Sequence, residues 1–312
     1  MTLATPYEIA VNLPYSIALV AVGCEVVWLA SRGTTPRRRI LRSVRVAAGM
    51  AVGGFIASVG YTHVLRALWG ALAPYGSAGL AGFWRDHPVV GALAAFVAWD
   101  LAGWLYHYIG HHTAVGWAAH QPHHSGEDFD ATLGLRQSWA PFHGILHQPL
   151  LALAGFDFRV IVVCAAVSNC WQVLEHTSVP LRLPRFMTAT VMTPGAHRHH
   201  HGTGNDAVNL GPVFTWWDRL AGTWVPADAP APASYGLGPL AATTSLGIEL
   251  AGWRQLAARI RCSRAPGGPE TGAERVVERR ANETRSAGAA VLRARGFAGP
   301  NGAEPHGTIS SR

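Results

Sequence analysis

Three long apolar stretches constrain the fold of this chain more than any other feature of its sequence. Residues 11–30, 46–70 and 88–105 are mostly apolar, interrupted by single charged residues such as Glu25 and Asp100. An α-helix needs about 20 such residues to cross the hydrocarbon core of a bilayer. Only 14% of the 312 residues are charged, against about 25% in soluble domains. The sequence therefore predicts a multi-pass membrane protein built from helices.

The distribution of arginine predicts which side of the membrane each segment faces. The segment 31–45, "SRGTTPRRRILRSVR", holds six Arg residues beside the first stretch, and such an excess marks the cytoplasmic side. The loop 71–87 is then on the far side, and the third stretch returns the chain to the cytoplasm before His107. Residues 145–174 are apolar but broken at 155–159, which favours a helical hairpin that enters and leaves from one face. The histidine clusters and the C-terminus are then expected on the cytoplasmic side.

The expected fold class is all-α: a multi-span helical membrane protein whose His-rich cytoplasmic helical cap holds a di-metal site. We expect N-terminal transmembrane helices over 1–90, a catalytic region over 91–240, and a C-terminal helix with a disordered basic tail over 241–312. From about Ala257 the composition is polar and without apolar periodicity, which is typical of disorder. Residues 254–312 hold eleven Arg and five Glu, so most of the formal charge of +7 lies there, and we expect no nucleic-acid partner.

Histidine is the second informative feature, because thirteen of the sixteen histidines lie between His107 and His201. One segment has HxxxH spacing and two have HxxHH spacing. Since residues i, i+3 and i+4 share one face of a helix, the imidazoles within each segment are expected to point to one place. With one isolated histidine they make nine, too many for the four ligands of a structural zinc site, and predict two metal ions with open positions. The nine expected ligands are His107, His111, His120, His123, His124, His176, His197, His200 and His201.

Four further histidines lie close to these nine in the sequence. His112 and His199 are direct neighbours of spaced residues, and His199, on another face of its helix, is expected to tolerate substitution best. His143 and His147 are again four residues apart. His112 and His147 are the candidates for additional ligands. Imidazole suits zinc, copper, iron and nickel alike, so spacing alone does not choose the metal.

Two other classes of protein remain open on the residues alone. A His-rich membrane metal-binding protein or transporter without oxygenase activity would share this composition, although transporters usually place their ligands near the bilayer midplane in broken helices. A membrane metallohydrolase would usually carry a carboxylate within its ligand motif, as in HExxH, and neither HxxHH segment has one.

The motifs together resemble the fatty acid hydroxylase superfamily, which includes the sterol desaturases and consists of integral membrane non-haem di-iron oxygenases. Four segments follow the family's order: "DLAGWLYHYIGHH", "HQPHHSGEDFDATLGLR", "WQVLEHT" and "TPGAHRHHHGTGNDAVNLGPVFTWWDRLAGTWVP". With the apolar stretches, the resemblance covers roughly residues 10–240. Tyr108 stands where the family commonly has Arg.

The resemblance implies a reaction and its cofactors. Two iron ions, which zinc could replace, would sit at the nine histidines and use O₂ to hydroxylate or desaturate an unactivated C–H bond of a lipid, such as a fatty acyl chain, sterol or hopanoid. Ether cleavage is a third outcome, and the sequence does not separate the three. Electrons would come from an external donor of the cytochrome b5 or ferredoxin type, and the lipid would enter laterally from the membrane.

An imidazole that binds a metal through one nitrogen needs a hydrogen-bond acceptor for the other. Asp100, Asp206 and Asp218 are candidates for this role. Asp100 is the best of them, because an acidic residue within an apolar stretch usually has a partner and a function. Arg136 matches the Arg that follows the second histidine box of the family and is also expected beside the site. Asp218 has an alternative role with Trp217, which is to fix the segment after the third box.

Overall fold

The computed structural model describes residues 6–33, 35–140, 142–181, 183–204, 207–238 and 243–264. Within these ranges the regular elements are helices, joined by loops and two isolated β-bridges, so the all-α class is confirmed. The last described helix, α11 (Ser245–Arg264), continues past Ala257, where disorder was expected to begin. The rest of the expected tail, from residue 265 onward, lies outside the described residues.

Three helices of the described chain are long and apolar enough to cross a membrane. They are α1 (Pro6–Arg32), α2 (Arg37–Leu72) and α4 (Pro88–His112), and each contains one of the three apolar stretches. The helix α4 continues beyond residue 105, so His107 and His111 lie on the last turns of a spanning helix. The expectation of apolar spans is thus confirmed by length and composition, whereas the side that faces the cytoplasm stays a prediction.

The segment 71–87 was expected to be a loop, and this expectation is wrong. It contains a short 3₁₀ helix, η1 (Ala73–Tyr75), and a nine-residue helix, α3 (Ala78–Asp86). The side chain of Ser77 accepts a hydrogen bond from the backbone N–H of Leu80 and so caps the start of α3. A serine N-cap outweighed the Gly and Pro content from which the loop was predicted.

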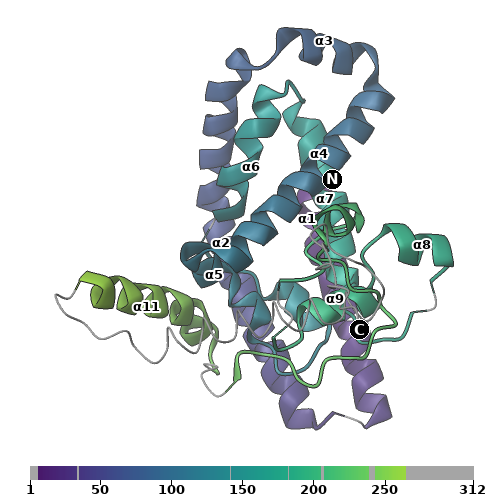
Figure 1. The fold of residues 1–312 in the computed structure, drawn as a ribbon, viewed down its shortest axis with the longest axis vertical. Helices are drawn as coiled ribbons and strands as arrows, with labels where there is room; N and C mark the ends of the chain where they lie inside the picture. Colours follow the sequence, from purple (N-terminus) through teal and green to yellow (C-terminus); the bar gives the residue numbers. More distant parts are fainter. Residues whose placement is uncertain are drawn as a thin grey trace, which may run out of the picture. The chain divides into compact units, whose positions relative to one another are not determined.

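The expected helical hairpin is present as α6 (Phe142–Leu153) and α7 (Phe158–Leu174). Figure 1 shows α6 between α2 and α4, and the helix contacts both. The turn between the hairpin helices needs Gly155, whose φ is +77° and where a Cβ atom would lie 2.9 Å from the backbone nitrogen of Ala81. Asp157 then caps α7 by accepting a hydrogen bond from the backbone N–H of Arg159 at 2.7 Å.

Short elements that follow α4 and α7 in the chain complete the fold and carry most of the remaining histidines of the described region. Thr113 ends α4 in an extended conformation and caps the next helix by accepting the N–H of Gly116. Thr193 caps another short helix, which has Pro194 at its first turn, where the missing N–H costs nothing. These elements are α5 (Ala114–His120), η2 (His123–Ser125), η3 (Ala131–Leu135), α8 (Arg185–Thr190), α9 (Pro194–His200) and α10 (Trp216–Ala221).

Candidate metal centre

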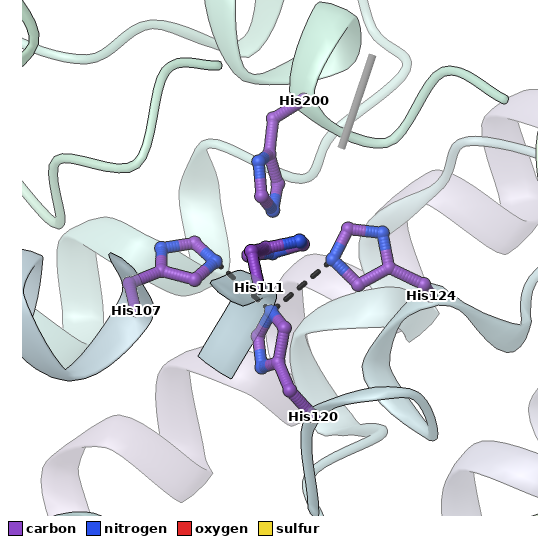
Figure 2. Close-up of side chains that lie close together, drawn as sticks. All are labelled: His107, His111, His120, His124 and His200. Carbon is purple, nitrogen blue, oxygen red and sulfur yellow. Dashed lines mark hydrogen bonds between the residues drawn. The ribbon is translucent and has the colours of Figure 1, made fainter. Parts of the chain in front are cut away.

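Five of the nine expected ligands form one group, which we call site A. Each ring offers one nitrogen, and these five atoms all lie within 4.8 Å of one another. Figure 2 shows the five rings converging from different parts of the chain, with the Nε2 atoms of His107 and His124 2.9 and 3.1 Å from that of His120. Site A consists of His107, His111, His120, His124 and His200.

The other four expected ligands form a second group, site B, whose ring nitrogens also lie within 4.8 Å of one another. The Nε2 atom of His176 is central, because the Nε2 atoms of the other three rings lie 3.0–3.2 Å from it. All four side chains are buried. Site B consists of His123, His176, His197 and His201.

The two HxxHH segments do not each point to one place, so that expectation is wrong. His120 and His124 belong to site A while His123 belongs to site B; in the other segment, His197 and His201 belong to site B while His200 belongs to site A. Adjacent residues are rotated by about 100° in an α-helix such as α9 and by about 120° in a 3₁₀ helix such as η2, so the two adjacent histidines of each segment point in different directions. Each segment therefore contributes to both groups and holds them together.

Backbone carbonyl groups fix the orientation of several imidazoles. The Nδ1–H of His107 donates to the carbonyl of Leu210 at 2.8 Å, and that of His200 to the carbonyl of Val208 at 2.9 Å. In site B, the Nδ1–H of His176 donates to the carbonyl of Gln172. Because a carbonyl oxygen only accepts, Nδ1 carries the proton in these three rings and Nε2 presents a lone pair to the site.

Hydrogen bonding among the imidazoles does not explain their spacing. One lone pair on Nε2 of His176 cannot accept N–H groups from three other rings at once. In site A, Nε2 of His200 and both nitrogens of His111 are buried without a hydrogen-bond partner. Nitrogens bound about 2.1 Å from one metal ion lie about 3.0 Å apart at right angles and about 3.4 Å apart at tetrahedral angles. The spacings of 2.9–3.2 Å therefore fit imidazole nitrogens that share a metal ion.

Burial keeps these rings neutral and ready to bind a cation. Burial lowers the pKa of His176 to about 4; its hydrogen bond to the carbonyl of Gln172 partly offsets this effect, and repulsion from His107 adds slightly to it. For His120, His124 and His200 in site A, and for the other three rings of site B, burial lowers the pKa well below the ordinary value. A neutral imidazole with a free lone pair is the form that binds a metal ion. The donor set thus fits two metal ions held by imidazole nitrogen.

Glu25 supports site B, and the sequence signalled it only as a lone carboxylate within an apolar stretch. Its side chain is 3% exposed. One carboxylate oxygen accepts the backbone N–H of Ser178 at 2.8 Å and the hydroxyl of the same residue. The other accepts the hydroxyl of Thr177 at 2.7 Å and the N–H of Ala131 at 3.3 Å. Glu25 therefore ties α1 to the residues that directly follow His176.

The expectation that Asp100 accepts a hydrogen bond from an imidazole is not met within the described chain. Its carboxylate accepts the backbone N–H groups of Val213 and Phe214, at 2.8 and 3.2 Å, and the indole N–H of Trp217 at 2.8 Å. Through these bonds the fully buried carboxylate links residues 213–217, which follow the HxxHH segment of His197 to His201, to α4. Backbone carbonyls, rather than carboxylates, take the second nitrogens of the rings described above.

Asp218 acts on site A through a peptide group. Its carboxylate accepts the N–H groups of Leu210 and Gly211, at 2.9 and 2.8 Å, and the hydroxyl of Thr223 at 2.6 Å. Since the carbonyl of Leu210 receives the Nδ1–H of His107, Asp218 fixes the acceptor of that ring. This arrangement corresponds to the alternative role considered for Asp218, with an indirect link to the ligand.

Arg136 is buried close to the HxxHH segment of His120 to His124. Its guanidinium donates to the hydroxyl of Ser43 on α2 at 2.7 Å and to that of Ser125 in η2 at 3.2 Å. Ser125 directly follows His124, so Arg136 positions this part of the chain and contacts none of the nine rings by a described hydrogen bond.

The remaining candidate residues lie apart from both groups or beyond description. His112 is exposed, with its ring stacked on Tyr108 at 3.8 Å. His199 belongs to neither group, as expected, but it is buried and hydrogen-bonded to the backbone of Ala227, which argues against the expectation that it tolerates substitution best. Asp206 and the side chain of His147 lie outside the described residues.

Comparison with known proteins shows what this part of the chain is similar to. Residues 92–223 match the family model described as "Fatty acid hydroxylase". Alkylglycerol monooxygenase of Homo sapiens is 31% identical over 140 residues, which cover 42% of this chain and 30% of that protein. The Xenopus tropicalis protein of the same name is 30% identical over 135 residues, with the same two coverages. Methylsterol monooxygenase 1 of Rattus norvegicus is 28% identical over 145 residues, or 42% of this chain and 45% of that protein.

The chain thus spans only about 30% of the length of the alkylglycerol monooxygenases that it matches. No solved structure matches the chain. The matched range includes both HxxHH segments, the HxxxH segment and His176, and hence every residue of sites A and B.

Proposed function

Because residues 92–223 belong to the fatty acid hydroxylase and sterol desaturase superfamily, we propose that the chain is a membrane-bound monooxygenase that acts on a lipid with O₂. Sites A and B would each hold one non-haem iron ion. The observation that carries this proposal is the convergence of nine imidazoles in two groups, seven of them buried and two half-buried, with Nε2 of three rings directed inward by a backbone carbonyl that receives Nδ1–H.

The nature of the donor set supports a redox metal with open positions. Imidazole suits iron, zinc, copper and nickel, and the choice of iron comes from the superfamily. Bound iron would supply the oxidation of an unactivated C–H bond by O₂, which no protein side chain performs. The chain's own contribution is to hold neutral rings in place and to bury them, which limits the access of water to the reacting atoms.

For the substrate, we infer that an ether lipid of the alkylglycerol class is the first compound to test, because several similar proteins carry the name alkylglycerol monooxygenase. Oxygen inserted beside the ether oxygen gives a hemiacetal, which separates into an aldehyde and a free glycerol hydroxyl. A methylsterol is the second compound, because one similar protein is named for it. The substrate would enter from the bilayer beside α4, whose last turns carry two ligands of site A.

Two further features complete the proposal. Sites A and B would face the cytoplasm, because the Arg-rich start of α2 lies on the same side of the spans as the histidines. Electrons would come from an external donor of the cytochrome b5 or ferredoxin type. The exposed side chains of Arg37, Arg38 and Arg45 favour a donor with an acidic docking surface.

The proposal is tested by metal content and product formation in the purified full chain. We expect close to two iron ions per chain, and we expect reductant, O₂ and an alkylglycerol lipid to give aldehyde. His200→Ala, which removes a ligand of site A, should lose iron and product, whereas His112→Ala, at the exposed last residue of α4, should keep both. A wild-type protein that binds transition metal but consumes neither lipid would favour the metal-binding or transport alternative. A protein without transition metal would overturn the proposal.

A further inference from the structure

Large apolar side chains lie exposed on two short helices near the metal sites. Phe186 in α8 is 71% exposed, and Leu220 and Trp216 in α10 are 81% and 40% exposed. The two helices are joined, because the N–H and hydroxyl groups of Thr215 donate to the carbonyls of Thr190 and Ala189, each at 3.1 Å. We call α8, α10 and the connected residues 213–215 the α8–α10 shoulder.

The shoulder is attached directly to the membrane-spanning helix α4. The ring of Phe214 lies 5.8 Å from that of Phe96 in α4 and stacks on the ring of Trp216 at 4.1 Å. Asp100, also in α4, receives the N–H groups of Val213 and Phe214. An unbroken row of aromatic rings therefore leads from the spanning helix to the exposed face of the shoulder.

The position of Asp100 along α4 sets the depth of this attachment. Asp100 lies twelve residues from either end of the 25-residue helix. At 1.5 Å per residue the helix is about 37 Å long, slightly more than the hydrocarbon core of about 30 Å. A helix that spans the bilayer therefore carries Asp100, and the backbone bonded to it, inside the hydrocarbon region.

The hydrogen bonding at Asp100 is what this depth requires. Non-helical backbone is tolerated in hydrocarbon only where its N–H and carbonyl groups find partners, and a carboxylate there needs donors. Here the carboxylate and the extended backbone satisfy one another, with the indole of Trp217 as a third donor. The N–H groups of Val213 and Phe214 are thus satisfied by α4, while Phe186, Trp216 and Leu220 are exposed. Arg185 and Arg219 are exposed on the same two helices, and long arginine side chains near a membrane interface extend their charged ends to the headgroups.

From these observations we propose that the α8–α10 shoulder is inserted in the membrane beside α4 and faces lipid acyl chains. Leu93 on α4 is 65% exposed and shares a helix face with Phe96, whose ring lies 5.8 Å from that of Phe214, so apolar side chains run from the exposed face of α4 to the shoulder. This continuity favours lipid over a second protein as the occupant. The inference rests on the span α4 and on the contacts of Asp100, and it is independent of the proposed activity.

Fluorescent labels at single cysteines test the insertion in the full chain. In a parent that carries Cys24→Ser, Cys170→Ser and Cys262→Ser and keeps only the buried Cys164, the exposed positions are changed one at a time as Leu220→Cys and Phe186→Cys and labelled with an environment-sensitive fluorophore. Leu93→Cys provides the lipid-facing control, and Asp228→Cys, at an exposed position near His199, provides the water-facing control. Each labelled protein is placed in phosphatidylcholine vesicles that contain a lipid with a nitroxide on its acyl chain.

We expect the labels at both shoulder positions to be quenched by the nitroxide to the same extent as the label at Leu93, and the label at Asp228 to be quenched far less. Quenching of both shoulder labels at the level of Asp228 would overturn the proposal. An apolar emission without quenching would also overturn it, because a protein partner would then cover the face. The two shoulder positions lie on different helices, so a substitution that prevents folding at one leaves the other to decide.

Discussion

Replacing Glu25 with glutamine should weaken site B and leave site A nearly unchanged. The carboxylate accepts four hydrogen bonds, two at each oxygen. Glutamine keeps one acceptor oxygen and places an NH₂ group against the other two donors. At about 1.5–3 kcal/mol for each bond to a charged group, the residues that Glu25 holds, at Ala131 and after His176, lose up to about 3–6 kcal/mol of support.

Only part of this loss should reach the metal ion. Substituting a residue that supports a ligand costs about 10–100-fold in metal affinity, which corresponds to about 1.4–2.8 kcal/mol. The remainder is recovered as the segment relaxes. In a titration with a competing chelator, followed by metal analysis of the protein, one of the two irons should dissociate at about 10–100-fold lower chelator in Glu25→Gln. The second iron should dissociate as in the wild type.

Glu249→Gln is a matched control for this experiment. Glu249 is also buried, and it accepts the hydroxyl of Ser138 and the N–H of Trp139, at 2.8 and 3.1 Å. Its substitution should lower the melting temperature without changing either iron. The reasoning is refuted if Glu25→Gln releases both irons together, releases neither, or behaves like the control.

Three further predictions follow from the same contacts. His199→Ala should lower the free energy of unfolding by about 1–3 kcal/mol with both metals retained, because His199 is buried and hydrogen-bonded. His112→Ala, at an exposed position, should change the free energy of unfolding by less than about 0.5 kcal/mol. Thermal unfolding with metal analysis checks both variants, and equal effects would contradict the argument from burial. Asp218→Asn should weaken iron binding at site A selectively, because it loosens the peptide that receives the Nδ1–H of His107; unchanged affinity in the chelator titration would argue against this link. The metal-free protein should lose stability as the pH falls below about 6.5. Burial lowers the pKa of the site histidines in the folded state, so the unfolded chain binds more protons in this range, and unfolding becomes easier. A melting temperature independent of pH between about 8 and 5 would contradict this sign.

The long-range organisation of the chain was largely predictable from local pattern. Apolar length predicted three spanning helices, and the break at 155–159 predicted the hairpin of α6 and α7. These features depend on hydrophobicity along a continuous segment, which the sequence displays directly. The helix α3 was missed because one serine cap decided a segment whose composition resembles a loop.

The membership of the metal-site groups illustrates what local pattern leaves open. Spacing predicted that nine histidines act together, and the structure gathers the same nine. Spacing did not predict that His123 would join site B while His120 and His124 join site A. Nor did it predict that His200 would join site A while His197 and His201 join site B. Helical rotation separates adjacent side chains by about 100°, but only the placement of α4, α7 and α9 decides what lies in each direction.

The supporting contacts were the least predictable. Asp100 and Asp218 were expected to bond to imidazoles, yet they bond to backbone N–H groups of residues 210–214. Glu25 reaches residues more than 100 positions away in the sequence. The sequence by itself determined which side chains are costly to bury, and hence that each needs a partner. The tertiary structure alone decided the partner, because a carboxylate accepts any N–H or O–H that the packing of helices brings within about 3 Å.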